Sequence, residues 1–268
     1  VDLKRDACGQ QNAQRRLDLD DGFDWLALWA LQVRRFLNAY ADQRLAVAAI
    51  ADLTDVAGVG LTRHAVNLGV LGCVMLPPFY YKGISDEGLF RFYASVIEGV
   101  GDDRLKVVLY HIPQVTSVLL GHDLIERLIT AFPDTIVGIK DSAGDIENMK
   151  AMVNRFPGFS VLAGADPLLL PLLQNGGAGC ITATSNLRAD ALRVVWDNWQ
   201  DPAQAETVSA AQDRINAWRE LTNSYVQLPT VKAMVSKARG NQDWCNLRPP
   251  LVPLTETERN TVWSNMTD

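Results

Sequence analysis

The segment TIVGIKDSAGD, residues 135–145, ends a run of β-branched apolar residues with Lys140, which Asp141 follows. An ammonium group at the end of a buried strand loses hydration, and an ion-pair partner or loss of the proton must offset this cost. A neutral amine can attack a carbonyl carbon and form a Schiff base. The alternative is a structural lysine paired with Asp141. The segment alone leaves both interpretations open.

Tyrosines close the two strand candidates that precede Lys140. Tyr110 ends the strand in VVLYHIP, and adjacent parallel strands lie about 4.8 Å apart, so its phenol can converge with Lys140 over one edge. A phenol beside an amine can move the protons that Schiff-base chemistry requires. Tyr81 lies in PPFYYKG (77–83), where two prolines and a glycine favour a loop at the same edge, and its phenol would extend a proton relay. Either tyrosine can instead be a packing aromatic.

Two glycine-containing segments complete this edge. In GADP (164–167), Gly164 allows a ligand to approach the backbone closely, and Asp166 either caps the next helix or binds a substrate hydroxyl. The segment NGGAGCITATSN (175–186) precedes a strand and does not open a helix, which excludes a phosphate-binding loop. The three histidines do not have the spacing of metal ligands, and no nucleophile elbow is present.

Short apolar runs alternate with amphipathic stretches from about Leu45 onward, a pattern that predicts about six βα repeats and a parallel sheet. The carboxyl ends of parallel strands share one edge, where active sites are built. The strand candidates are 45–51, 72–77, 106–112, 135–140, 159–165 and 179–184. The helix candidates between them are 56–68, 86–100, 122–132, 145–156 and 166–175.

The ends of the chain differ from the repeats. Residues 1–21 are polar and 23–40 predict one amphipathic helix, so the two further strands of an eight-stranded barrel are not found there. After residue 186 the sequence predicts a helix to Trp199, a break at Asp201-Pro202, helices over 203–221 and 229–240, and then the proline-rich RPPLVPL. We expect a TIM-type barrel over 1–201, atypical over 1–40, and a C-terminal helical extension over 202–268.

Composition narrows the class of partner. The 268 residues are 48% hydrophobic and 21% charged, as in globular proteins, and the net charge of −6 is spread without a basic cluster. Nucleic acid and membranes are therefore not expected as partners. The expected partner is a small molecule. The four cysteines show no metal-ligand spacing and predict reduced core thiols. With no signal peptide visible, a cytoplasmic protein is expected.

Taken together, LPPFYYKGISDEGL, VVLYHIP, GIKDSAGD, GADP, GGAGCITATSN and RPPLVPL resemble the dihydrodipicolinate synthase and N-acetylneuraminate lyase family. The resemblance covers the chain from about residue 45 to its end. It implies a barrel that binds pyruvate as a lysine Schiff base, without metal or organic cofactor, in a homo-oligomer that is a tetramer or dimer. By position, it implies Lys140 as the pyruvate-binding lysine and Tyr110 as the proton-transfer tyrosine. It further implies Tyr81 as a relay tyrosine near a neighbouring subunit, Ile181 as a carbonyl near pyruvate, and Gly164 and Asp166 as rim contacts of a second substrate.

The sequence departs from the family pattern in three places. The synthase branch has an arginine for the aldehyde carboxylate where Val115 stands, and the sialic-acid branch has Glu and Ser where Pro167 and Ala183 stand. Neither well-known second substrate is therefore expected. The family's Gly-Thr-Thr-Gly-Glu carboxylate site should fall near LDLDDGFD (17–24), where no Thr occurs and two aspartates would repel a carboxylate.

Two explanations account for the third departure. Either the N-terminal part is altered or truncated, or other structure replaces the first two barrel strands, whose loss would expose sheet edges. We favour the first explanation. The expected function is a Schiff-base-forming lyase, an aldolase or hydro-lyase, acting on pyruvate or a related 2-keto acid. The alternative is a catalytically impaired barrel that binds a keto acid or a partner because the carboxylate site is missing.

Overall fold

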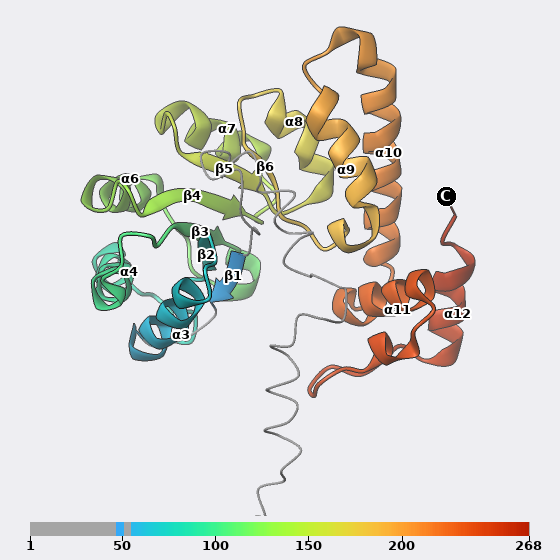
Figure 1. The fold of residues 1–268 in the computed structure, drawn as a ribbon, viewed down its shortest axis with the longest axis horizontal. Helices are drawn as coiled ribbons and strands as arrows, with labels where there is room; N and C mark the ends of the chain where they lie inside the picture. Colours follow the sequence, from blue (N-terminus) through green and yellow to red (C-terminus); the bar gives the residue numbers. More distant parts are fainter. Residues whose placement is uncertain (1–46, 51–54, 268) are drawn as a thin grey trace, which may run out of the picture.

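The computed structural model of the chain describes residues 47–50 and 55–267, and side chains from Gly58 onward. Among these residues, six parallel strands pair in chain order and form one sheet (Figure 1). They are β1 (Val47–Ile50), β2 (Gly72–Met75), β3 (Val107–His111), β4 (Ile136–Asp141), β5 (Ser160–Ala163) and β6 (Gly179–Cys180). The interpretations of residues 1–40, including the segment 17–24 and its missing Thr residues, lie outside the described residues.

The register of the strands places the candidate residues side by side. Tyr110 pairs with Lys140, and His111 pairs with Asp141, the residue after Lys140. On the other side of β4, Lys140 pairs with Leu162. Because successive side chains of a strand point to opposite faces, Tyr110 and Lys140 share one face of the sheet, and His111 and Asp141 share the other.

The two faces of the sheet have different surroundings. A small apolar cluster fills the face that carries Lys140, and it consists of Val74, Val108, Leu162 and Ile181 with Tyr110 packed against it. The main hydrophobic core lies between the other face and the helices. The first face is the interior of the barrel, and Asp141 therefore points into the helical layer.

Helices connect the strands and cover the outer face of the sheet (Figure 1). They are α3 (Asp55–Asn67), α4 (Asp86–Val100), α6 (His122–Ala131) and α7 (Ile146–Arg155). The boundaries of α4 follow from its ends, because the Ser85 hydroxyl accepts a hydrogen bond from the Gly88 amide and Gly101 ends the helix at φ +61°. A short helix that the sequence did not predict, α5 (Pro113–Thr116), follows β3.

The sixth strand is shorter than the predicted 179–184. Its ladder continues only to the Ile181 amide, which donates to the Ala163 carbonyl. Beyond that point the hydroxyls of Thr182 and Thr184 donate to the Asp166 carboxylate, and the Ser185 hydroxyl donates to the Thr182 carbonyl. These side-chain hydrogen bonds stabilise a turn of the backbone between the end of β6 and the start of the next helix.

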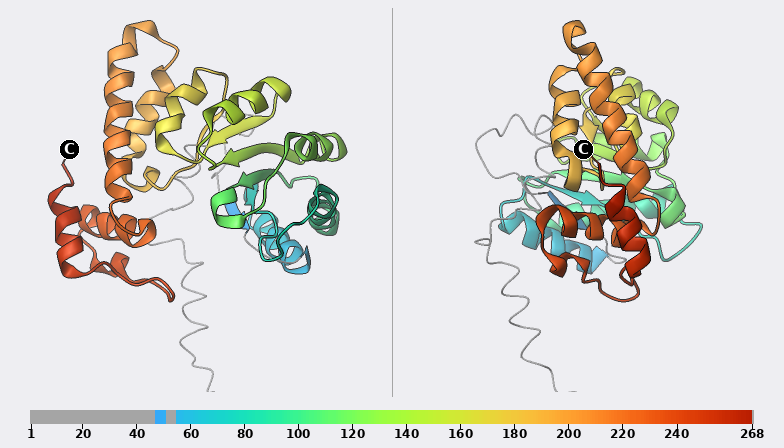
Figure 2. Two further views of the ribbon diagram at one scale, coloured as in Figure 1. Left: turned by 180° about the vertical axis from the view of Figure 1, so that it is seen from behind. Right: turned by 90° about the vertical axis from the view of Figure 1, so that its right-hand side faces the viewer.

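The chain after β6 is helical (Figure 2). After β5 come η2 (Asp166–Leu168) and α8 (Leu169–Leu173), and after β6 comes α9 (Ser185–Asn198). The long helix α10 (Ala205–Thr222) packs along α9, and α11 (Gln227–Arg239) and α12 (Glu256–Ser264) share a separate small core. The short 3-10 helices η3 (Pro202–Gln204) and η4 (Gln242–Cys245) connect these elements. The division of the chain between 201 and 202 stays a prediction.

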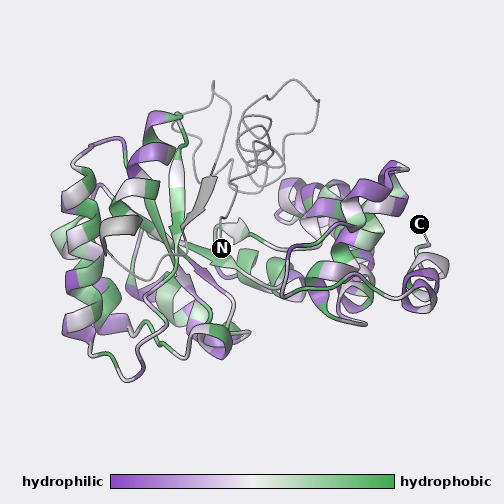
Figure 3. Ribbon diagram, turned by 90° about the horizontal axis from the view of Figure 1, so that it is seen from below, coloured by the Kyte–Doolittle hydropathy of each residue, from purple (hydrophilic) through white to green (hydrophobic). Residues whose placement is uncertain are grey.

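The distribution of polar residues agrees with this arrangement. In Figure 3 the strands are mainly hydrophobic, while the helices carry polar residues along one side. Cys73 and Cys180, both placed in strands as expected, are buried free thiols, and Cys245 is half-buried. Cys8 lies outside the described part of the chain. None of the helices described has both the length and the apolar character that a membrane span requires.

Candidate active site

Lys140 and Tyr110 form the centre of the candidate site. The Lys140 side chain is buried, with 7% of its surface exposed, and its Nζ lies 4.0 Å from the centroid of the Tyr110 ring. The ring face attracts an ammonium group, and the ring itself packs against the apolar interior cluster. Hydrogen bonds for proton transfer commonly tighten only when substrate binds. The observed distance between Lys140 Nζ and the Tyr110 ring is therefore compatible with proton transfer by the Tyr110 hydroxyl.

Asp141 is not positioned to be the ion-pair partner of Lys140. Its carboxylate is fully buried on the helical side of β4. One carboxylate oxygen accepts a hydrogen bond from the Ala143 amide at 2.8 Å, and the other accepts one from Asn148 Nδ2 at 2.9 Å. The interpretation of Lys140 as a structural lysine paired with Asp141 therefore loses its support.

A partly buried chain of polar side chains extends from Asp141. Asn148 Oδ1 lies 2.9 Å from Nε2 of His122, the first residue of α6. His111 lies opposite Asp141, and its Nδ1 accepts a hydrogen bond from the Leu120 amide at 3.3 Å. Burial lowers the pKa of His111, while the Asp141 carboxylate opposes this shift. Sequence reasoning tested the histidines only as metal ligands and missed this network, although His111 and Asp141 directly follow the two candidate catalytic residues.

The loop after Lys140 is held from several sides. The Ser142 amide donates to the His111 carbonyl at 2.8 Å, and the Ser142 carbonyl accepts from Gln114 Nε2 at 2.7 Å. Gly164 faces this loop so closely that an added Cβ would lie 1.8 Å from the Ser142 hydroxyl oxygen. Gly164 thus lies at the predicted rim, and the geometry explains its glycine by packing against Ser142. Its contact with a second substrate stays a prediction.

Asp166 has a different environment from the two that the sequence suggested. It is fully buried, and its carboxylate accepts hydrogen bonds from Thr182 and Thr184 and an ion-pair contact from Arg219 at 3.3 Å. Burial raises the pKa of Asp166, and these partners oppose the rise. The side chain connects β5 to the segment after β6 and to α10, and a contact with substrate would require it to leave these partners.

Ile181 and Tyr81, the remaining predicted residues, lie in opposite environments. Ile181 is fully buried in the interior cluster at the carboxyl end of β6. Tyr81 is 68% exposed, and its ring contacts Tyr80 edge to face with centroids 5.3 Å apart. Tyr81 therefore lies at the surface of the chain, and its relay role stays a prediction. Val115, where the synthase branch has arginine, is exposed on α5.

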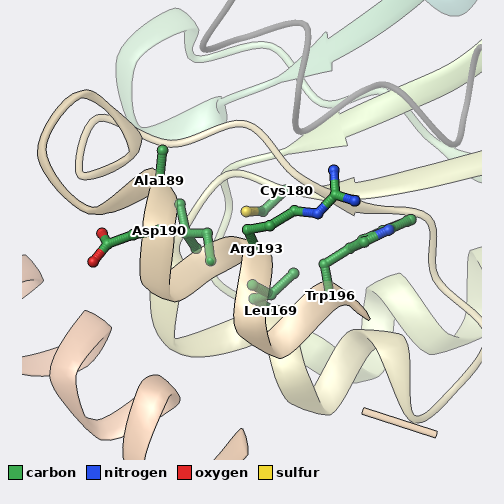
Figure 4. Close-up of a pocket in the computed structure, with 7 residues that line it drawn as sticks. Leu169, Cys180, Ala189, Asp190, Arg193 and Trp196 are labelled. Atoms are coloured by element: carbon green, nitrogen blue, oxygen red, sulfur yellow. The ribbon is translucent and has the colours of Figure 1, made fainter. Parts of the chain in front are cut away.

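A cavity of about 250 Å³ lies outside this site (Figure 4). Leu169, Cys180, Leu192 and Trp196 give it an apolar lining, and Arg193 and Asp190 also border it. Burial raises the pKa of the Cys180 thiol well above its ordinary value, which leaves no nucleophile there. Among the described residues, no three His, Cys, Asp or Glu side chains gather as metal ligands do.

Comparison with known proteins identifies related sequences. The model of the dihydrodipicolinate synthetase family matches residues 40–268. A DapA-like lyase of Chloroflexus aurantiacus, itself uncharacterized, is 35% identical over 208 residues, which are 78% of this chain and 67% of that protein. The 4-hydroxy-tetrahydrodipicolinate synthase of Bacillus subtilis is 29% identical over 211 residues, which are 78% of this chain and 70% of that protein.

Solved structures support the fold. Dihydrodipicolinate synthase from Agrobacterium tumefaciens superposes with a TM-score of 0.72 at 26% identity, covering 87% of this chain and 78% of that one. The synthase from Bacillus anthracis gives a TM-score of 0.74 at 25% identity, with 87% and 77% covered. These likenesses confirm the expected TIM-type fold with its helical C-terminus. Since the family model covers most of the chain, this protein belongs to the dihydrodipicolinate synthetase family.

Proposed function

We propose that the chain is a lyase of the aldolase or hydro-lyase type that binds pyruvate or a related 2-keto acid as a Schiff base on Lys140. The observation that carries this proposal is the buried amine of Lys140 against the Tyr110 ring, on two strands that place both residues in register. The family membership supports the same chemistry, because its named relatives include lyases and 4-hydroxy-tetrahydrodipicolinate synthases.

In the proposed reaction the neutral Lys140 amine adds to the C2 carbonyl of the keto acid. The carbonyl oxygen leaves as water, and the resulting iminium withdraws electrons from the neighbouring carbon. Loss of a C3 proton then gives an enamine, whose carbon can attack an aldehyde, and cleavage follows the reverse course. Tyr110 moves the protons in both steps. The imine is the electron sink, so the scheme needs no metal and no organic cofactor.

The second substrate is proposed to differ from that of the synthase branch. Val115 occupies the place of the arginine that would bind an aldehyde carboxylate, and its side chain is exposed and apolar. Without a cation at this position, a carboxylate on the aldehyde loses its partner. We therefore infer an aldehyde without a carboxylate at that end.

The homo-oligomer expected from the resemblance is also part of this proposal. Tyr81 is 68% exposed on the loop after β2, so we place its relay role at a subunit boundary, where a neighbouring chain would cover it. A tetramer or dimer would supply that boundary. A cytoplasmic location suits an enzyme that acts on a small keto acid.

A second candidate function is a barrel that binds a keto acid or a partner without turnover. The absence of Thr from the segment 17–24 favours it, because the family uses that motif to hold the pyruvate carboxylate. Such a protein would bind pyruvate but would not catalyse proton loss at C3.

Exchange of the pyruvate methyl protons in D2O separates the two candidates, because it requires imine and enamine formation but no second substrate. We expect the wild-type chain to remove the methyl signal in proton NMR spectra and Lys140→Ala to lack this activity. Lys150→Ala, which removes a half-buried lysine of α7 paired with Glu147, is the matched control and should behave as wild type. Binding of pyruvate without exchange would reject the lyase and favour the second candidate.

A further inference from the structure

The buried carboxylate of Asp141 has no part in the chemistry above, yet it lies next to Lys140 in the chain. We propose that Asp141 is a positioning residue, whose hydrogen bonds with Asn148 and the Ala143 amide fix the end of β4 and thereby hold the Lys140 amine against Tyr110. This inference rests on the proposed function and names the residue that sets its geometry.

The first argument is the cost of burying this group. A carboxylate with none of its surface exposed is tolerated only when hydrogen bonds or charges compensate its lost hydration. Both oxygens of Asp141 are used, one by the Ala143 amide in the loop after β4 and one by the Asn148 side chain on α7. The carboxylate therefore connects the end of the strand to the helix that follows it.

The second argument is the set of groups that surround the carboxylate. His111 lies opposite Asp141 on β3. Asn148, the partner of Asp141, is also bonded to His122 at the start of α6, with 2.9 Å between Asn148 Oδ1 and His122 Nε2. Because Asn148 donates through Nδ2 to Asp141, its oxygen accepts, and His122 Nε2 is the donor of that contact. The chain of bonds thus has one direction, from His122 through Asn148 to Asp141.

The third argument is the place of these bonds relative to the reacting groups. The backbone at Asp141 joins neighbouring strand ends, since its carbonyl accepts from the Gly164 amide at 2.7 Å and the Ser142 amide donates to the His111 carbonyl. These contacts lie one residue beyond Tyr110 and Lys140 on their strands. A shift of the strand end moves the Lys140 amine relative to the ring, and small misplacements of reacting groups reduce rates strongly.

The structure suggests a reciprocal exchange of residues as the test. In Asp141→Asn, one of the two carboxylate oxygens is replaced by an NH2 group. This donor then faces another donor, either Asn148 Nδ2 or the Ala143 amide. Asn148→Asp turns two carboxylates toward each other. The double variant Asp141→Asn/Asn148→Asp restores a donor and an acceptor between the two positions, keeps an acceptor for the Ala143 amide and leaves a carboxylate for His122. The negative charge moves to α7, while the pattern of hydrogen bonds is kept.

The readout is the pyruvate methyl exchange, with kcat and KM measured separately. A misplacement of reacting groups by about 1 Å can reduce a rate by about 100-fold, so each single variant should lose about 10- to 100-fold in kcat, with KM changed less than about threefold. The double variant should recover to within about threefold of wild type. Single variants with wild-type kcat, or a folded double variant that stays as slow as the singles, would overturn the proposal.

A second variant and a second readout make the test independent of folding and of turnover. Asn148→Ala removes the side-chain bonds to Asp141 and His122 from a half-buried helical position, and a melting temperature well above that of the assay shows that the variant is folded. Reductive methylation of Lys140 with formaldehyde and cyanoborohydride, which reduces the imine, is followed by peptide mass and reports access to the amine without pyruvate. We expect Asn148→Ala to label Lys140 several times faster than wild type. Equal labelling of wild type and Asn148→Ala would contradict the positioning role. Absence of methyl exchange in wild type is a different result, which would reject the proposed function but leave the labelling test valid.

Discussion

At the scale of single residues, the central feature is an amine in a place where a protonated amine is poorly hydrated. Lys140 is 7% exposed and lies above an aromatic ring rather than beside Asp141. The face of the Tyr110 ring packs against the amine, and apolar side chains of the barrel interior pack against the ring.

Tyr110→Phe tests the phenol. The ring stays in the apolar cluster, so the stability of the protein should change little, while the loss of the hydroxyl should slow methyl exchange by about 100-fold or more. Tyr80→Phe is the control, because Tyr80 is a largely exposed loop residue that pairs with Tyr81. Proton NMR gives both rates, and an unchanged rate in Tyr110→Phe would remove the phenol from the mechanism.

The residues of the site differ in how far the sequence could predict them. Lys140 and Tyr110 were predicted to meet because parallel strands in sequence order bring their carboxyl ends to one edge. The environment of Asp166 was not predicted, because its partners Thr182 and Arg219 lie 16 and 53 residues away. Hydrogen bonds of this separation depend on how helices pack on the sheet, and local patterns carry no information about that.

At the scale of elements, the loop after β4 packs against Gly164, which directly follows β5. An alanine at Gly164 would place its Cβ 1.8 Å from the Ser142 hydroxyl oxygen and 2.8 Å from the Ser142 Cα. Because backbone as well as side chain is in the way, Gly164→Ala should cost about 1–3 kcal/mol of unfolding free energy and reduce exchange activity.

Gly121→Ala is the matched control for that loop variant. Gly121 has φ −71°, and an added Cβ there meets nothing within 4 Å. Urea denaturation of both variants measures the difference. Equal midpoints for Gly164→Ala and wild type would show that Ser142 does not need the glycine.

His111 predicts how the junction of β3 and β4 responds to acid. Burial lowers the pKa of His111 in the folded protein, so as pH falls through its ordinary value of about 6.5 the unfolded chain binds the proton first. Stability from this group is therefore complete above that pH and decreases below it. In His111→Asn, thermal unfolding between pH 7 and 5 should depend less on pH than in wild type. Identical pH dependence in the two proteins would contradict this account.

Elements with regular periodicity were predicted well, and short ones were not. The boundaries predicted for α4 agree with the structure because Ser85 and Gly101 mark its ends. The helix α12 was missed behind the prolines, although Thr255 and Glu258 form a capping box that a sequence reading could have found. The end of β6 was misplaced because threonines that favour strands are used there to bind Asp166.

At the scale of the whole molecule, Asp166 connects the barrel to the C-terminal extension. Its carboxylate bonds to Thr182 and Thr184 and contacts Arg219 on α10, while Gln212 Nε2 donates to its backbone carbonyl at 3.0 Å. Removing one partner of a buried ion pair leaves the other uncompensated. Asp166 therefore stabilises the packing of α10 against the segments that follow β5 and β6.

Asp166→Ala should reduce the free energy of unfolding by about 3–5 kcal/mol, because Arg219 and two hydroxyls lose their acceptor. Glu147→Ala, which removes a largely exposed ion pair with Lys150, is the control and should leave stability within experimental error. Chemical denaturation followed by circular dichroism measures both. A loss no larger than that of the control would show that the extension does not depend on this carboxylate.

The described sheet ends at β1 and β6, and the chain spans 67% and 70% of the two sequence relatives compared above. The apolar cavity between β6, α8 and α9 adjoins one of these ends. The sequence predicted six repeats and an atypical first 40 residues. Local patterns do not predict how the sheet continues beyond β1 and β6, because that depends on pairing between distant strands.

The most direct measurement is borohydride reduction in the presence of pyruvate, followed by intact mass and peptide mapping. The account predicts one added reduced pyruvate unit on the peptide that contains Lys140, absent from Lys140→Ala and present in Lys150→Ala. No added mass at millimolar pyruvate, or an adduct that remains in Lys140→Ala, would contradict it.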